Sequence, residues 1–157
     1  SQLQRAEDNI KRRREIAARY YEAFSEIPQI KDRNHEANPE QQTTNDEPLS
    51  TNHEPRTTKN ESRKTNHENP HAYHLYVIEA ENRLGLYNHL REHKIFAQIH
   101  YIPLHLMPYY SNAGWKLGDL PNAEAYYGKC ISLPMYPTLS EEEQRFVIES
   151  IKEFYTQ

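Results

Sequence analysis

Residues 98–105 of this chain of 157 residues, Gln-Ile-His-Tyr-Ile-Pro-Leu-His, gather the side chains best suited to chemistry. Two imidazoles and a phenol, from His100, Tyr101 and His105, can hydrogen-bond phosphate, hydroxyl or carboxylate groups. Pro103 fixes a turn that brings His105 back toward the other two. In the alternative interpretation Tyr101 is a core residue and both histidines bind backbone carbonyls. The residues alone leave these two interpretations open.

Other candidate chemistry is weaker. The chain has 4 glycines and no Gly-rich phosphate loop, and we predict neither a catalytic residue nor a metal site. The 1 cysteine, Cys130, precedes an apolar stretch and is interpreted as a small core residue rather than a nucleophile. The basic run at residues 11–14 could contact DNA, but a solvated helix face is the favoured interpretation. A net charge of -4 also argues against a nucleic-acid partner.

The segments that flank the candidate residues differ sharply in composition. Residues 3–24 carry apolar side chains three, four or seven positions apart, which predicts one long amphipathic helix closed by Pro28. This helix lacks a convincing N-terminal cap, and we expect it to begin before Ser1. Residues 71–157 again have the apolar content of a globular domain.

Residues 31–70 separate these two parts and contain only Ala37 and Leu49 as apolar side chains. Such a segment cannot bury enough apolar area to offset its ordering entropy, so a disordered low-complexity insertion is predicted. The triplet Asn-His-Glu recurs within it, at residues 34–36, 52–54 and 66–68. Three His-Glu pairs could ligate a metal, but on a flexible chain a repeat-expanded linker is the favoured interpretation.

A β-α-β unit is predicted to carry the candidate site. The apolar run at residues 73–80 indicates a buried strand, and the alternation at residues 95–101 indicates a second one. Between them, Asn82 caps a predicted helix whose inner face is formed by Leu84, Tyr87 and Leu90.

The rest of the domain is predicted to be helical with one short extended piece. Residues 123–129 form a short predicted helix, followed by extended residues 131–134. Ser140 and Glu143 form a capping box that starts the final helix. The predicted fold class is α/β (α+β), a two-layer small domain in which helices cover a small sheet.

Nothing in the sequence predicts a membrane or secretory protein. No apolar run approaches the ~20 residues of a membrane span. The first nine residues are polar, unlike a signal peptide, and the single cysteine fits a reducing compartment. We expect a soluble, cytoplasmic protein.

Four ordered blocks resemble the C-terminal region of the DegT/DnrJ-type sugar aminotransferases: residues 13–21, 90–95, 98–105 and 133–143. The resemblance implies the small domain of the aspartate-aminotransferase fold. It also implies pyridoxal 5'-phosphate as cofactor of the parent family, a nucleotide-linked keto-sugar as substrate and glutamate as amino donor. Residues 97–101 and 105–110 are most similar to the branch that makes UDP-4-amino-4,6-dideoxy-N-acetyl-altrosamine for pseudaminic acid, which implies a UDP-linked 4-keto-6-deoxy sugar.

The resemblance also implies how the chain is divided. Residues 1–30 correspond to the helix that joins a large domain absent from this chain, residues 31–70 to an insertion, and residues 71–157 to the small domain. His100, Tyr101 and His105 become candidate substrate-binding residues on the wall of the sugar-nucleotide cleft.

In that family the lysine that forms the Schiff base lies in the large N-terminal domain, and no lysine here has its sequence context. We therefore expect this chain alone to be inactive and not to bind pyridoxal phosphate covalently. Its expected partners are the missing N-terminal domain and, as in the parent family, a second subunit of a homodimer. The alternative is a non-catalytic remnant domain that binds a partner through its long helix.

Overall fold

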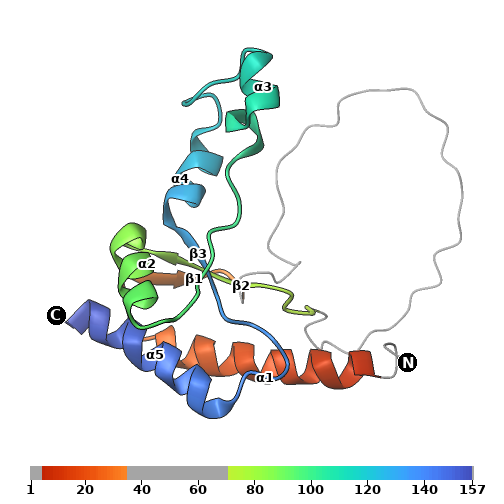
Figure 1. Cartoon of the computed structure of the whole chain (residues 1–157), viewed down its shortest axis with the longest axis vertical. Coiled ribbons are helices and arrows are strands. Elements are labelled where there is room, and N and C mark those ends of the chain that lie inside the picture. Colours follow the sequence, from red (N-terminus) through yellow and green to blue (C-terminus); the bar gives the residue numbers. More distant parts are fainter. Residues whose placement is uncertain (1–4, 35–70, 157) are drawn as a thin grey trace, which may run out of the picture. The chain divides into compact units, whose positions relative to one another are not determined.

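The computed structural model describes residues 5–34 and 71–156. Figure 1 shows their elements, which are α1 (Ala6–Phe24), β1 (Ile30–Asp32), β2 (Tyr76–Ala80), α2 (Arg83–Glu92), η3 (Leu104–Leu106), α3 (Pro108–Asn112), α4 (Pro121–Lys129), β3 (Cys130–Leu133) and α5 (Glu141–Thr156). This mixture of helices and a small sheet confirms the predicted fold class. From residue 35 onward, the predicted insertion lies outside the described residues.

The sheet is antiparallel and has the order β1-β2-β3. Ile30 pairs with Ala80 across β1 and β2, and Tyr76 pairs with Leu133 across β2 and β3. All residues of β3 are buried, although β2 is the middle strand of the sheet.

The predicted second strand of the β-α-β unit is wrong, because residues 95–101 form one isolated antiparallel bridge, between Gln98 and Ser132 of β3. Since β3 is antiparallel to β2, residues 95–101 do run parallel to β2, but β3 lies between them. The next hydrogen-bonded pair on one side of the bridge would join Phe96 to Pro134. Proline has no N–H to donate, so the ladder cannot extend there.

Strand β1 corrects the start of the predicted insertion, because Lys31 and Asp32 belong to the sheet. The Tyr76 hydroxyl donates a hydrogen bond to the Asp32 carboxylate, and Arg33 pairs with Glu79. An edge strand is held by backbone hydrogen bonds and can carry charged side chains. Apolar content alone therefore placed the boundary too early.

The buried face of α1 agrees with the predicted amphipathic helix. Ile16, Ala17, Tyr20 and Phe24 are buried on one side of it. The Tyr20 ring lies 5.6 Å from the Phe24 ring and 5.0 Å from the Tyr76 ring, between ring centroids. Burial is the main cause that raises the pKa of the Tyr20 hydroxyl well above its ordinary value. The aromatic stack joins α1 to the sheet.

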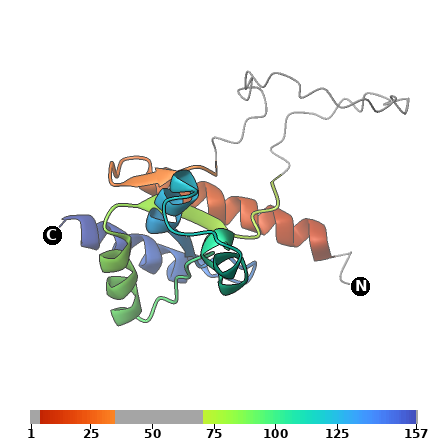
Figure 2. The ribbon, with the colours of Figure 1, turned by 90° about the horizontal axis from the view of Figure 1, so that it is seen from above.

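Helix α5 contacts both α1 and α2, as Figures 1 and 2 show. Its predicted capping box is confirmed: the Glu143 N–H donates to Ser140 Oγ at 3.1 Å, and the Ser140 N–H donates to Glu143 Oε2 at 2.8 Å. Inside the helix, the buried Gln144 amide donates to the Ile16 carbonyl at 2.8 Å. This polar contact fixes α5 against α1.

Helix α2 is capped as predicted, since the Asn82 side chain accepts a hydrogen bond from the Gly85 N–H at 3.3 Å. Its predicted inner face is partly wrong: Leu86 and Leu90 are buried, whereas Leu84 is 65% exposed. Leu84 and Leu86 are two positions apart, which places them about 200° apart around the helix. Burial of Leu86 therefore directs Leu84 to solvent.

Two parts of the molecule differ in packing. We call the part formed by α1, the three strands, α2 and α5 the packed body. The other part, residues 101–129 with η3, α3 and α4, we call the exposed segment; Figure 1 shows α3 and α4 leading away from α1 and α5. His105 is the only buried residue among residues 101–129, all of which the structure describes. None of the described helices has the length and apolar character needed to cross a membrane.

Candidate functional site

His100 and Tyr101 lie together where the chain leaves the sheet. The Nδ1 atom of His100 is 2.9 Å from the Ser132 hydroxyl, and the centroids of the His100 and Tyr101 rings are 4.7 Å apart. Ser132 is buried on β3, so it holds the half-buried imidazole from beneath. Tyr101 is 74% exposed, which contradicts the alternative that it is a core residue. Its hydroxyl and one imidazole edge can therefore meet a ligand.

His105 has a different environment. Its side chain is buried, and its Nε2 atom lies 2.8 Å from Oε1 of Glu124 on α4. A carboxylate only accepts hydrogen bonds, so His105 Nε2 carries the proton and donates it. The other ring nitrogen, Nδ1, has no hydrogen-bond partner within the part of the chain that the structure describes. The buried contact of His105 with Glu124 therefore joins η3 to α4 within the exposed segment.

The Glu124 carboxylate accepts several of the hydrogen bonds that hold the exposed segment together. Besides the His105 imidazole, it accepts hydrogen bonds from the Gly118 N–H at 2.8 Å and the Leu120 N–H at 3.3 Å. The bond from His105, followed by those backbone donors, lowers the pKa of the Glu124 carboxyl. Gly118 has a φ of 96°, a left-handed conformation that glycine adopts without a steric penalty. One carboxylate thus ties η3 and the loop before α4 together.

The structure brings together His100 and Tyr101, whereas the described contact of His105 is with α4. Sequence reasoning missed both partners of the histidines, Ser132 and Glu124. They lie 32 and 19 residues away along the chain, in segments whose own patterns indicate only a strand and a helix. No local signal in the sequence identifies either of them.

The surface around Tyr101 is unusually apolar. Ten large apolar side chains of the exposed segment are exposed, namely Tyr101, Ile102, Leu104, Met107, Tyr109, Tyr110, Trp115, Leu117, Leu120 and Tyr126. Large apolar side chains that are exposed together in one segment are typical of a region that binds a partner. The candidate residues therefore lie beside a surface suited to being covered.

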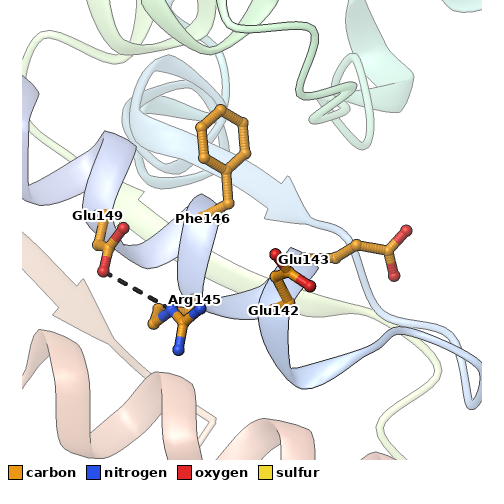
Figure 3. A pocket seen from close by; sticks show the side chains of 5 residues that line it. All are labelled: Glu142, Glu143, Arg145, Phe146 and Glu149. Carbon is orange, nitrogen blue, oxygen red and sulfur yellow. Dashed lines mark ion pairs between the residues drawn. The ribbon is translucent and has the colours of Figure 1, made fainter.

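A separate hollow of about 450 Å³ lies over the first turns of α5 (Figure 3). It is lined by Glu142, Glu143, Arg145, Phe146 and Glu149, and Arg145 pairs with Glu149 at 3.9 Å. Three carboxylates against one guanidinium repel phosphate groups, so the hollow does not suit a nucleotide. It also lies apart from the candidate residues, none of which lines it.

Cys130 is fully buried at the start of β3, and burial is the main cause that raises the pKa of its thiol. A raised pKa disfavours the nucleophilic thiolate at neutral pH. This agrees with the interpretation of Cys130 as a core residue.

Solved structures of sugar aminotransferases share this fold. S. venezuelae DesV, solved in complex with a ketimine intermediate, is 25% identical with a TM-score of 0.71, and the match covers 99% of this chain and 34% of that one. Helicobacter pylori PseC, an aminotransferase involved in the biosynthesis of pseudoaminic acid, is 20% identical with a TM-score of 0.73, covering 99% of this chain and 35% of that one. The architecture is therefore that of one portion of a sugar-aminotransferase fold.

The sequence carries the assignment further. Residues 44–152 match the DegT/DnrJ/EryC1/StrS aminotransferase family. The spore coat polysaccharide biosynthesis protein SpsC of Bacillus subtilis is 31% identical over 160 residues, which cover 97% of this chain and 33% of SpsC. The chain belongs to the DegT/DnrJ/EryC1/StrS aminotransferase family and spans about a third of the length of these relatives.

The described lysines do not suit the covalent chemistry of pyridoxal phosphate. A Schiff-base lysine is desolvated or placed beside another cation, which lowers its pKa and makes it nucleophilic. Within the described part of the chain every lysine is exposed: Lys11, Lys31, Lys94, Lys116, Lys129 and Lys152. None of these described lysines therefore has the environment of a Schiff-base lysine.

Proposed function

We propose that the chain forms the substrate-side wall of a nucleotide-sugar aminotransferase, with the cofactor held by an N-terminal domain outside this chain. The observation that carries this proposal is the exposed Tyr101 beside His100, within a motif that resembles the family, at the edge of the exposed segment. A residue that lines a substrate cleft needs a polar group that is free to contact the substrate and a neighbouring group that fixes the position of its side chain. Tyr101 has the free hydroxyl, and the hydrogen bond with the Ser132 hydroxyl holds the His100 imidazole in place.

In this proposal, the three candidate residues have two different roles. Tyr101 and His100 form hydrogen bonds with the sugar or phosphate oxygens and orient the substrate. His105 is a positioning residue that acts through Glu124, because its Nε2 is already occupied and its ring is buried. Loss of His105 would release the loop around Gly118 rather than remove a substrate contact.

The exposed apolar side chains define where the rest of the enzyme would sit. The packed body contains the buried apolar core, whereas Leu104, Tyr109 and Leu117 of the exposed segment remain 65%, 80% and 73% exposed. The relatives are about three times as long as this chain. In this proposal, the additional residues of the enzyme cover this face. Covering it would bring the catalytic lysine of the complementary portion near Tyr101, and a homodimer would complete the assembly.

The proposed substrate is a UDP-linked 4-keto-6-deoxy sugar, with glutamate as amino donor. The support is the likeness of residues 97–101 and 105–110 to the branch that makes a UDP-linked amino sugar. Comparing UDP- and dTDP-linked forms of the same keto-sugar tests the nucleotide directly. Equal turnover of both forms would contradict the UDP assignment but leave the aminotransferase proposal intact.

The test is complementation. The full chain is mixed with the N-terminal two thirds of Bacillus subtilis SpsC and pyridoxal phosphate, and transfer of the amino group from glutamate to the keto-sugar is measured. We expect the two parts to associate and to be active only together. Tyr101→Ala should lower kcat/KM by ~10- to 100-fold. Tyr136→Ala is the matched control, since this tyrosine is 42% exposed but lies outside the exposed segment.

A second experiment concerns the chain alone. Incubation with pyridoxal phosphate followed by borohydride reduction should leave no stoichiometric phosphopyridoxyl-lysine at a single position. One uniquely labelled lysine would overturn the assignment of the cofactor anchor to residues outside this chain.

A second candidate function is the non-catalytic domain that binds a partner through its long helix, and the exposed apolar side chains of residues 101–129 would add to that binding surface. Complementation separates the two. Association without activity, or no association, favours the partner-binding domain; restored amino transfer favours the enzyme.

A further inference from the structure

His89, His93 and Glu153 meet where α2 contacts α5, on the packed body and outside residues 98–129. One possible ligand atom from each of the three side chains lies within 4.8 Å of the other two. The two histidines are four positions apart, so they lie on the same face of α2. The Nε2 atom of His93 is 3.9 Å from Oε2 of Glu153 on α5.

Backbone carbonyls decide which ring nitrogens can bind a cation. The His89 Nε2 atom is 2.9 Å from the Ser150 carbonyl, and the His93 Nδ1 atom is 2.8 Å from the His89 carbonyl. A carbonyl only accepts, so each of these nitrogens carries a proton and donates it. In the neutral rings, Nδ1 of His89 and Nε2 of His93 are then the nitrogens that offer lone pairs to a cation. Metal-binding histidines are commonly oriented by this type of hydrogen bond.

The surroundings suit a small divalent ion. The His89 and His93 rings lie side by side with centroids 4.3 Å apart, and Phe154 lies 5.4 Å from His89. Phe146 lies 6.4 Å from the His93 ring, so apolar rings border the cluster on both sides. The His93 and Glu153 side chains are 33% and 55% exposed, which leaves an entry path and room for a water ligand.

We propose that His89, His93 and Glu153 bind Zn²⁺ or a similar divalent transition-metal ion, which joins α2 to α5. Two imidazoles, one carboxylate and a water are a donor set that zinc accepts in tetrahedral geometry. Bonds of ~2.0–2.2 Å place tetrahedral ligand atoms roughly 3.3–3.5 Å apart, so ligand atoms that lie within 4.8 Å of one another must move closer together when the ion binds. The His93 and Glu153 side chains are partly exposed and can both adjust their rotamers to do so.

This site departs from the sequence prediction of no metal site. The pattern His-x-x-x-His within a helix was the available signal, but Glu153 is 60 residues farther on. Only the contact between α2 and α5 brings the third ligand into place. The proposal is independent of the aminotransferase function.

The experiment is a Zn²⁺ titration of the full chain, followed by calorimetry and by the thermal unfolding midpoint. We expect one tight site and a higher midpoint in the presence of the ion. His93→Gln and Glu153→Gln should each weaken binding by at least ~10-fold and remove the thermal shift. The matched control replaces His35, His53 and His67 with glutamine, which removes the three His-Glu pairs and should leave the tight site unchanged.

Two outcomes of the titration overturn the proposal. The absence of a tight site, or its loss only in the triple control, would assign the histidines of α2 to an ordinary ion pair. If His93→Gln alters the circular dichroism of the metal-free chain, the Zn²⁺ affinity of Glu153→Gln tests the proposal instead. The Glu153 side chain lies at the surface, so its replacement leaves the core intact. Unchanged affinity in that variant would overturn the proposal.

Discussion

The packed body and the exposed segment use apolar side chains in opposite ways. In the packed body Tyr20, Tyr76 and Ile151 are completely buried, and the residues around them belong to the same chain. In the exposed segment Tyr109 and Leu117, just as apolar, are at least 73% exposed. An apolar side chain therefore indicates that some surface must cover it, but not whether that surface lies in the same chain.

The two regions also differ in what holds them together. The packed body has a continuous apolar core with a few buried polar contacts such as that of Gln144. The exposed segment, which the structure describes in full, lacks such a core and is held by hydrogen bonds, among them those of the Glu124 carboxylate with the His105 imidazole and the Gly118 N–H. Stability is thus expected to reside in the packed body, and local order in the exposed segment to depend on hydrogen bonds.

The largest expected effect contrasts one deletion in each region. Ile151→Ala removes a fully buried side chain of α5 and should lower the free energy of unfolding by about 2–5 kcal/mol. Leu117→Ala should change it by no more than about 0.5 kcal/mol, because Leu117 is 73% exposed. Urea unfolding of both variants measures the contrast. Equal losses would show that the exposed segment is packed in solution.

The next effect concerns the start of α5. Ser140→Ala removes the oxygen that accepts the Glu143 N–H and should cost about 1 kcal/mol of unfolding free energy. Ser111→Ala is the matched control in the exposed segment; its hydroxyl donates to the Pro108 carbonyl within the short helix α3. Urea unfolding should show a loss for the first variant only. A larger loss for Ser111→Ala would reverse the comparison.

The capping box also predicts a pH dependence. The hydrogen bond from the Ser140 backbone N–H lowers the pKa of the Glu143 carboxyl. Because the folded pKa is lowered, the stabilisation is present above the ordinary value of 4.5 and is lost as the pH falls through the lowered pKa. Glu143→Gln should flatten that part of the stability profile measured by urea unfolding between pH 3 and pH 6, about one to two units either side of the ordinary pKa. An unchanged slope would contradict the capping role.

The smallest effect on global stability is expected for a substitution of Glu124, which should instead change the hydrogen exchange of nearby amides. Glu124→Gln should leave the urea midpoint unchanged but speed hydrogen exchange of the Gly118 and Leu120 amides, whose acceptor is weakened. The same amides should lose protection in the unmodified chain as the pH falls through the lowered pKa of Glu124. Glu142→Gln, on the exposed surface of α5, is the control. Unchanged exchange at Gly118 would show that another group holds the loop.

Sequence patterns predicted the parts whose structure is local. The stripe of α1, the Asn82 cap and the capping box at Ser140 all depend on residues within a few turns of one helix, and all three are present. The side of α2 that faces the core was predicted less well, because Leu84 and Leu86 compete for it and packing against the sheet favours Leu86.

The candidate site was predicted only as a list of residues. The motif singled out His100, Tyr101 and His105, but their environments depend on Ser132 and Glu124, which have no motif of their own. Whether any of the three binds substrate stays a prediction, with Tyr101 the most accessible of them.

The order of the residues decided where the helices lie, because spacing, caps and prolines act over a few positions and need no distant partner. Tertiary structure decided the strand order, the end of the ladder at Pro134 and the meeting of His89 and His93 with Glu153. These features join segments far apart along the chain, and their energies exist only once packing has brought the segments together.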